Sequence, residues 1–213
     1  MKKQFYLLTL SLALAWSPLF AAHYTIDPNH SQVTFKIRHM GISKVGGKFD
    51  KFSGDFDYEE GKPKTWKAQA VIEAASIDTG VEKRDNHLKS SDFFDVEKYS
   101  TLTFKSTEVQ DLGKGKAKLS GLLNMHGVEK PVTLDLEIGG VVPDMGGKGT
   151  RAGFAATVVV SRKDFGMTTG APMVGDDVEI AISVEGVSEN PNAPADKKME
   201  QQNKMEKKPM EKK

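Results

Sequence analysis

Polar and apolar residues alternate along most of the chain with a period of two. Val33, Phe35 and Ile37, for example, are each followed by a polar residue. The same alternation gives further apolar faces at Ala68, Ala70, Ile72 and Ala74; Leu102, Phe104 and Ser106; Leu119, Gly121 and Leu123; Val132, Leu134, Leu136 and Ile138; Phe154, Ala156, Val158 and Val160; and Val178, Ile180, Ile182 and Val184. Successive side chains of a β-strand point to opposite faces, so the pattern predicts strands with one wet and one apolar face.

Turn-forming residues separate these segments at short intervals, as at His126-Gly127, which predicts an antiparallel meander. About eight such strands either stack as a sandwich or close into a barrel, and closure removes exposed edges. Small residues interrupt the inward faces where a sandwich would place large ones, namely Gly54, Ala70, Ala74, Gly121 and Ala156. The sequence therefore predicts an all-β fold, an eight-stranded antiparallel barrel with room for one elongated ligand.

One short helical segment is predicted between the strands. Residues 81–90 contain good helix formers, and residues 76–79 offer N-cap candidates. A single helix cannot form a layer, but it can act as a lid on a barrel mouth. Phe93 and Phe94 follow it, and two adjacent aromatics cannot face the same way on a regular element. At least one ring is therefore expected between the helix and the sheet.

The first 22 residues are typical of a secretory signal peptide. A basic start is followed by an apolar run from Phe5 to Trp16 and by small residues ending at Ala22. A membrane anchor is the alternative, but the run is shorter than the roughly 20 residues a spanning helix needs, and Pro18 interrupts it. No Cys follows to carry a lipoprotein anchor. We expect a periplasmic protein without stable membrane insertion.

Composition narrows the classes of function. The chain has no Cys, so the fold must be stable without disulfides or thiolate metal sites. The net charge is +1, but Lys2 and Lys3 lie in the predicted signal peptide and residues 188–213 contribute a net +2. The intervening domain therefore has a net charge of about −3, which argues against a nucleic-acid partner.

Residues 188–213 form a Lys/Met/Glu-rich segment without aromatic or β-branched residues. Such a composition cannot offset the entropy lost on ordering, so we expect a disordered tail. Met199, Met205 and Met210 are possible soft ligands for Cu(I). Because no His or Cys accompanies them, a solubilising tail in which Met is incidental is the simpler interpretation.

Several motifs resemble those of a known family. The run from Arg84 to Ser90, with residues 92–95 and the strand at 104–106, is similar to the signature of the YceI-like polyisoprenoid-binding proteins. Agreement extends to His30-Ser31 with Val33, Phe35 and His39; to Gly127 through Pro131-Val132; to Arg162 with Asp164-Phe165-Gly166; and to Asp177-Val178 with Ile180. The resemblance covers residues 24–187, and it implies a periplasmic lipocalin-like barrel enclosing a long isoprenoid or similar amphipathic lipid. Ser100 departs from the Pro that the family commonly has, and the tail lies outside the family pattern.

The apolar inward positions are the candidate contacts for the lipid tail. They are Val33, Phe35, Ile37, Phe49, Phe52, Phe56, Ile72, Phe93, Phe94, Leu102, Phe104, Phe154 and Val158. Burial of an isoprenoid tail among them gains about 25 cal/mol per Å² of apolar area. His39, Arg84 and Arg162 are the candidates for a head group, either a phosphate or a quinone oxygen.

Each candidate also has a purely structural interpretation. The apolar residues could simply pack a small barrel. Arg84 could pair with Asp85 on the helix surface, and Arg162 with Asp164 in a loop. His39 could be a buried, hydrogen-bonded histidine.

The chain carries no nucleophile elbow, metalloprotease helix or phosphate-cradling glycine loop, and its histidines lack the spacing of metal ligands. We therefore expect no catalytic residue, no metal and no cofactor other than a bound isoprenoid lipid or quinone. Two functions remain: a periplasmic protein that binds or sequesters such a lipid, and a stress-response protein that acts through surface contacts with its barrel filled by its own side chains. The head group, the role in transport, storage or stress protection, and assembly as a homodimer stay open.

Overall fold

The computed structural model of the chain describes residues 21–145 and 149–189. Its strands are β1 (Ala22–Ile26), β2 (Gln32–His39), β3 (Ser43–Phe49), β4 (Phe52–Tyr58), β5 (Lys67–Glu73), β6 (Ile77–Asp78), β7 (Thr101–Gly113), β8 (Lys116–Met125), β9 (Val128–Pro143), β10 (Gly149–Ser161) and β11 (Val174–Glu189). The helical elements are α1 (Glu82–Lys89) and the 3₁₀ segments η1 (Pro63–Thr65), η2 (Ala74–Ser76) and η3 (Arg162–Phe165). None of these described helices is long and apolar enough to cross a bilayer.

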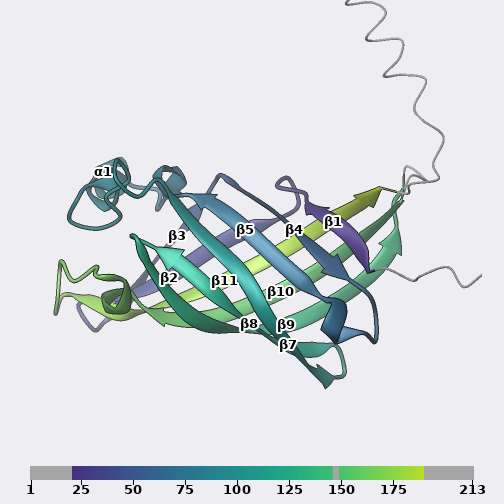
Figure 1. Cartoon of the computed structure of the whole chain (residues 1–213). Coiled ribbons are helices and arrows are strands. Elements are labelled where there is room, and N and C mark those ends of the chain that lie inside the picture. Colours follow the sequence, from purple (N-terminus) through teal and green to yellow (C-terminus); the bar gives the residue numbers. More distant parts are fainter. Residues whose placement is uncertain (1–20, 146–148, 190–213) are drawn as a thin grey trace, which may run out of the picture.

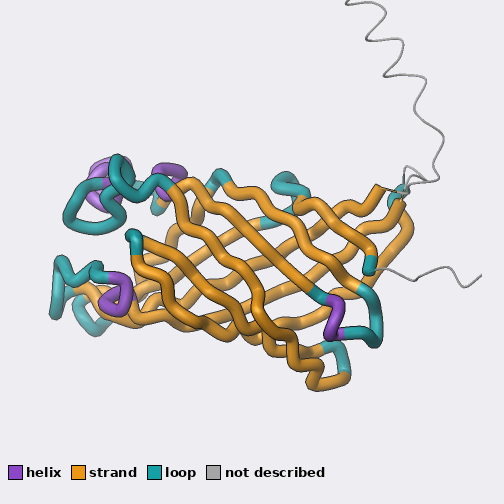
Figure 2. Tube along the Cα trace, viewed as in Figure 1, coloured by secondary structure: helices purple, strands orange, loops and turns teal. Residues whose placement is uncertain are grey.

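Eight strands close into an antiparallel barrel in the order β1-β4-β5-β7-β8-β9-β10-β11, and β11 returns to β1 (Figure 1). The closing register places Thr25 opposite Val187 and Ile26 opposite Gly186. Figure 2 shows the strands running obliquely to the long axis of the molecule, the tilt that closure requires. The predicted eight-stranded barrel with one short helix is confirmed.

The remaining strands extend one end of the barrel. β11 pairs with β1 near its own end and with β2 along most of its length, from Val174 to Ser183. β2 pairs with β3, and β3 pairs with the short β6, which follows β5 along the chain. The interruptions between β1 and β2 and between β3 and β4 let the long, tilted walls bend, and β6, which among the described strands pairs only with β3, ends the sheet.

Apolar side chains from the alternating positions fill the interior in three clusters. One, beneath α1, includes Val33, Phe49 and Leu102. Another, at the end away from α1, includes Tyr24 and Phe56, and a third, with Leu119, contacts residues of both. The period of two in the sequence thus determines which side chains face inward.

The helix lies almost where the sequence predicts, but its N-cap residue differs. Residues 76–79 do not provide the N-cap, because Val81 occupies that position and makes no side-chain capping bond. Instead, Asp85 within the helix accepts hydrogen bonds from the backbone N–H of Thr79 at 2.9 Å and from its hydroxyl at 2.5 Å. A residue inside the helix thus bonds back to the segment before it, and the prediction of an N-cap within residues 76–79 was wrong.

The first and last barrel strands overlap the predicted signal peptide by one residue and the predicted tail by two, while cleavage of the signal peptide stays a prediction. Ala22 belongs to β1, opposite Tyr58, although it was placed in the signal peptide. Ser188 and Glu189 extend β11 opposite Thr150 and Gly149, although the tail was expected to begin at residue 188. The rest of the predicted signal peptide up to residue 20, and the predicted tail from residue 190 with its three Met, lie outside the described residues.

Candidate ligand-binding site

An apolar cavity of about 200 Å³ lies inside the barrel beneath α1. Its wall combines strand residues with Leu88 of α1 and Met167 of the loop between β10 and β11. The strands supply every second side chain to this space because their pleat alternates inward and outward positions. We refer to this space as the outer cavity.

A second apolar cavity of about 130 Å³ lies deeper in the barrel, and we call it the inner cavity. Six residues line both cavities: Ile26, Ala70, Phe104, Leu134, Ile182 and Val184. The two spaces are therefore neighbouring compartments of one interior. Small side chains make this room, since Ala156 and Ala68 line the inner cavity at positions where a larger residue would fill it.

Packed aromatic rings close the end of the inner cavity that lies away from α1. The ring of Phe154 meets Phe56 edge-on at 5.2 Å and Tyr58 at 5.0 Å between centroids. Trp66 packs against Tyr58 at 4.7 Å and donates from Nε1 to the carbonyl of Glu59 at 2.6 Å. Burial of the Tyr58 hydroxyl raises its pKa, as expected in a dry environment. The indole N–H of Trp66 thus stays bonded while the apolar bodies of these rings form a floor.

The segment after α1 covers the opposite end. Both Phe93 and Phe94 line the outer cavity. Phe94 meets Phe49 edge-on at 5.8 Å, and Phe93 meets the His87 ring at 5.0 Å. The expectation that at least one ring enters the interior is fulfilled by both, because residues 91–94 form turns rather than a regular element.

All the predicted tail contacts line the interior. Phe56 and Phe154 belong to the inner cavity, and Phe104 to both. The remaining predicted contacts line the outer cavity: Val33, Phe35, Ile37, Phe49, Phe52, Ile72, Phe93, Phe94, Leu102 and Val158. Their contact with a ligand stays a prediction, but a ligand inside the cavities would lie next to them.

Arg162 is the one predicted head-group residue that reaches the cavity wall in the described part of the chain. Arg162 is only 3% exposed, and burial lowers the pKa of its guanidinium. Four backbone carbonyls accept its hydrogen bonds: Gly175 from Nε at 2.8 Å, Met167 and Thr169 from Nη1 at 2.7 Å each, and Val174 from Nη2 at 3.2 Å. Nη2 also lies 3.7 Å from Asp176. The side chain therefore holds the loop between β10 and β11, and its ion-pair partner is Asp176 instead of the expected Asp164.

The other two predicted head-group residues lie elsewhere. Arg84 donates from Nε to the hydroxyl of Thr79 at 2.7 Å and from Nη2 to the Thr79 carbonyl at 2.9 Å. His39 is half-buried at the end of β2, opposite Ser43 and Val174. Neither lines the two cavities in the part of the chain that the structure describes.

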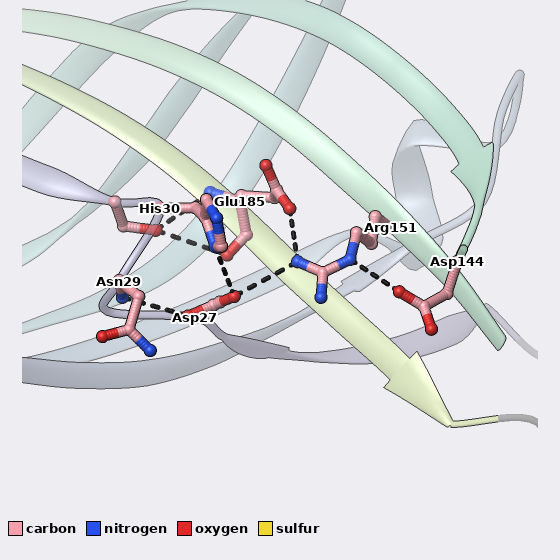
Figure 3. A network of polar contacts seen from close by, with 7 residues as sticks. Asp27, Asn29, His30, Asp144, Arg151 and Glu185 are labelled. Carbon is pink, nitrogen blue, oxygen red and sulfur yellow. Dashed lines mark hydrogen bonds and ion pairs between the residues drawn. The ribbon is translucent and has the colours of Figure 1, made fainter. Parts of the chain in front are cut away.

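A polar network joins the segments after β1 and β9 to β10 and β11 (Figure 3), and no sequence motif indicates it. Arg151 donates to Asp27 at 3.1 Å, to Glu185 at 2.5 Å and to Asp144 at 2.7 Å. Hydrogen bonds from His30, from the backbone of Asn29 and from Arg151 lower the pKa of Asp27 to about 2. The carboxylates in turn raise the pKa of Arg151. Residues so distant in sequence leave no local signal.

Within this network, the atoms of Asp27, His30 and Glu185 that could ligate a metal lie within 4.8 Å of one another. Such a cluster could attract a cation. Arg151, however, already contacts both carboxylates, so a positive charge of the protein occupies the position. We interpret the cluster as an ion-pair network that ties the turn after β1 to β10 and β11.

The fold and its interior define a closed antiparallel β-barrel with an apolar binding cavity. The chain belongs to the YceI-like domain family, whose profile matches residues 24–186. A UPF0312 protein of Vibrio parahaemolyticus is 40% identical over 193 residues, covering 88% of this chain and 99% of its own. The match extends over nearly the whole barrel and is not confined to a single motif.

Solved structures show the same fold. The Campylobacter jejuni YCEI protein is 34% identical, with a TM-score of 0.64 over 73% of this chain and 91% of its own. A polyisoprenoid binding domain from Saccharophagus degradans matches with a TM-score of 0.60 over 79% of this chain and 99% of its own. At 17% identity, this second likeness concerns the fold alone.

Proposed function

We propose that the protein binds and sequesters a long-chain isoprenoid lipid inside the barrel, in the periplasm, and that it catalyses no reaction. The observation that carries the proposal is the pair of adjoining apolar cavities, of about 200 and 130 Å³, between the α1 end and the aromatic floor. An elongated apolar chain fits two compartments in series better than a compact ligand does. The fold shared with a domain described as polyisoprenoid binding supports the same ligand class.

The energetics favour an apolar tail. Each 100 Å² of tail surface that leaves water gains about 2.5 kcal/mol. The preformed walls keep the ordering cost small, which is the usual condition for tight binding in such a cavity. The cavities also weigh against a barrel filled by its own side chains.

The position of Arg162 favours a neutral head group over a phosphate. A guanidinium has five N–H donors, and four carbonyls already accept from Arg162. An anionic phosphate would find a charge with little donor capacity left, and Asp176 lies nearby. An isoprenoid quinone, whose head needs one or two hydrogen bonds, is therefore the preferred ligand. The periplasmic location rests on the predicted signal peptide.

Lipid extraction tests the proposal directly. Protein purified from its native cells without detergent is extracted with organic solvent, and the extract is analysed by mass spectrometry. We expect an isoprenoid quinone in near-stoichiometric amount, and uptake of added quinone in preference to polyprenyl phosphate. Recovery of no lipid together with no uptake of either compound would refute the binding function, whereas preferential uptake of the phosphate would refute only the head-group choice.

A matched pair of variants locates the ligand. Ala156 lines the inner cavity, whereas Ala155, its neighbour on β10, is exposed on the outside of the barrel. Ala156→Trp should fill the inner cavity and lower quinone uptake at least tenfold, while Ala155→Trp should leave it unchanged. Overpacking costs about 1–3 kcal/mol, so circular dichroism must first show that both variants keep the β-rich fold. Equal uptake by the two variants would contradict an interior binding site.

A further inference from the structure

The turn between β2 and β3 lies at the end of the barrel that bears α1 (Figure 1). It exposes apolar side chains to solvent. Ile42 is 84% exposed and Met40 is 51% exposed. Met173, in the loop between β10 and β11, is 48% exposed, and its carbonyl accepts a hydrogen bond from the Met40 N–H at 2.6 Å. We call these three residues the apolar tip.

The backbone of the tip is held in a conformation that disfavours its own side chains. Met40 has φ +51° and Gly41 has φ +75°. Asn and Gly are the residues that tolerate two successive left-handed positions, and a Met there carries a conformational cost. The Ile42 N–H donates to His39 at 3.2 Å, and Arg38 donates to the Gly41 carbonyl at 3.1 Å. An ordered turn thus presents apolar groups to solvent at a site where a polar residue would be more stable.

Basic residues stand directly behind the tip. Arg38 and Lys44 are opposite each other across the hairpin, and like charges in this position repel. Lys44 hydrogen-bonds Glu179 at 2.5 Å, and this bond, with the charges of Lys36 and Arg38, lowers the pKa of Glu179. Three bases therefore surround one acid, which leaves an excess of positive charge.

The adjoining loop, residues 162–177, carries two bases and three acids, which lowers this excess from two charges to one. Lys163 and Asp176 pair there at 2.6 Å. The same loop leads to the cavity, because Val174, the residue after Met173, lines the outer cavity. The tip, the basic residues and the wall of the outer cavity at Val174 thus lie at the same end of the molecule.

We propose that the apolar tip docks the barrel on an anionic bilayer surface. Ile42, Met40 and Met173 would enter the boundary between head groups and acyl chains, while Arg38 and Lys44 meet lipid phosphates. Surface-bound proteins commonly combine these two contributions, and each is reversible. Docking brings the outer cavity against the phase in which apolar ligands dissolve. The inference goes beyond ligand binding and does not require it.

Vesicle flotation with the full mature chain tests the proposal. The probes are vesicles of phosphatidylcholine alone and vesicles containing one third phosphatidylglycerol. We expect binding to the anionic vesicles that weakens as salt is raised, since the Debye length falls from about 10 Å at 0.1 M to 3 Å at 1 M. Wild-type protein that binds neither kind of vesicle would overturn the proposal.

Two substitutions separate the tip from other surfaces. Ile42→Asp should lower the fraction bound to anionic vesicles at least fivefold. Val159→Asp is the matched control, because Val159 is 60% exposed on β10 and lies outside the tip. Both variants keep the Lys-rich C-terminal residues, so binding that survives Ile42→Asp would assign the interaction to another region and overturn the proposal.

Uptake of quinone from detergent micelles is measured in parallel. Ile42→Asp should leave it unchanged, since Ile42 lines neither cavity among the described residues. Loss of vesicle binding with retained uptake supports the docking tip. Retained vesicle binding with lost uptake would contradict it and would leave the binding cavity as a separate question.

Discussion

Arg162 places a charge in an apolar interior, which is costly unless every donor finds an acceptor. Its four carbonyl partners come from Met167, Thr169, Val174 and Gly175, all within the loop between β10 and β11 and the start of β11. The guanidinium thereby replaces the regular hydrogen bonds that this irregular segment lacks. At the scale of single residues, the barrel depends on such side-chain to backbone bonds.

Removal of this side chain should destabilise the protein markedly. Arg162→Ala leaves four buried or partly buried carbonyls without a donor, and each buried group left unsatisfied costs about 1–3 kcal/mol. Lys163→Ala is the control, because Lys163 forms an exposed ion pair with Asp176 and such pairs contribute at most about 1 kcal/mol. Urea unfolding followed by circular dichroism measures both. Similar midpoints for the two variants would contradict the structural role of Arg162.

Asp27 should make stability depend on pH. Its pKa is about 2 in the folded protein against an ordinary value of 3.8, so folding stabilises the ionised carboxylate of Asp27. This contribution is present above about pH 4 and is lost as pH falls toward 2. Asp27→Asn should therefore lower the unfolding midpoint at pH 5 and have a smaller effect at pH 2. A difference that does not change with pH would rule out the carboxylate as its source.

The local sequence pattern predicts the strand faces better than it predicts where the helix starts. The strand faces were predictable because the pleat imposes a period of two, and Val33, Phe35 and Ile37 all line the outer cavity as expected. The helix start was not, because Asp85 reaches back to Thr79 in place of a forward cap. Hydrogen bonds between flanking segments depend on how the chain folds back, which residue preferences do not encode.

β7 contributes Phe104 to the boundary that the two cavities share. Phe104 lines both cavities, and its ring lies against Gly121 of β8 so closely that a Cβ there would overlap it. If the proposed lipid occupies both compartments, the ring controls how far a chain can extend. A small residue at position 121 is therefore required by the ring at position 104.

Phe104→Ala should join the compartments and shift the binding preference toward longer isoprenoid chains. Phe104 is half-buried, and truncation of a fully buried Phe costs about 3–5 kcal/mol, so the fold must be verified before binding is measured. Thr103→Ala, on the exposed face of β7, is the control. Competition between a short and a long polyprenyl quinone measures the preference. An unchanged preference in Phe104→Ala would contradict the division of the interior.

The molecule as a whole is held together by closure. The pairing of β1 with β11 at Thr25 and Val187 joins the first strand to the last, and it removes the edges that an open sheet would expose. The network of Arg151, Asp27 and Glu185 lies beside this seam and ties the same strands through side chains.

Truncation distinguishes the barrel from the residues beyond it. Removal of residues 190–213 should change the melting temperature by no more than about 2 °C and leave quinone uptake intact, because the seam remains. Removal of residues 185–213 takes away Gly186 and Val187 and should abolish cooperative unfolding. Differential scanning calorimetry compares the two. A large loss of stability in the shorter truncation would contradict the predicted disordered tail.

The sequence by itself determined the all-β class, the inward faces and the single helix, because the pleat and helix propensity act over a few residues. It also identified Arg162, but not its four carbonyl partners. Only the tertiary structure decided that the barrel closes at the seam between β1 and β11, that the interior has two compartments, and that Arg151 gathers three carboxylates. These features join residues up to 162 positions apart, such as Thr25 and Val187, and no local pattern constrains which of them meet.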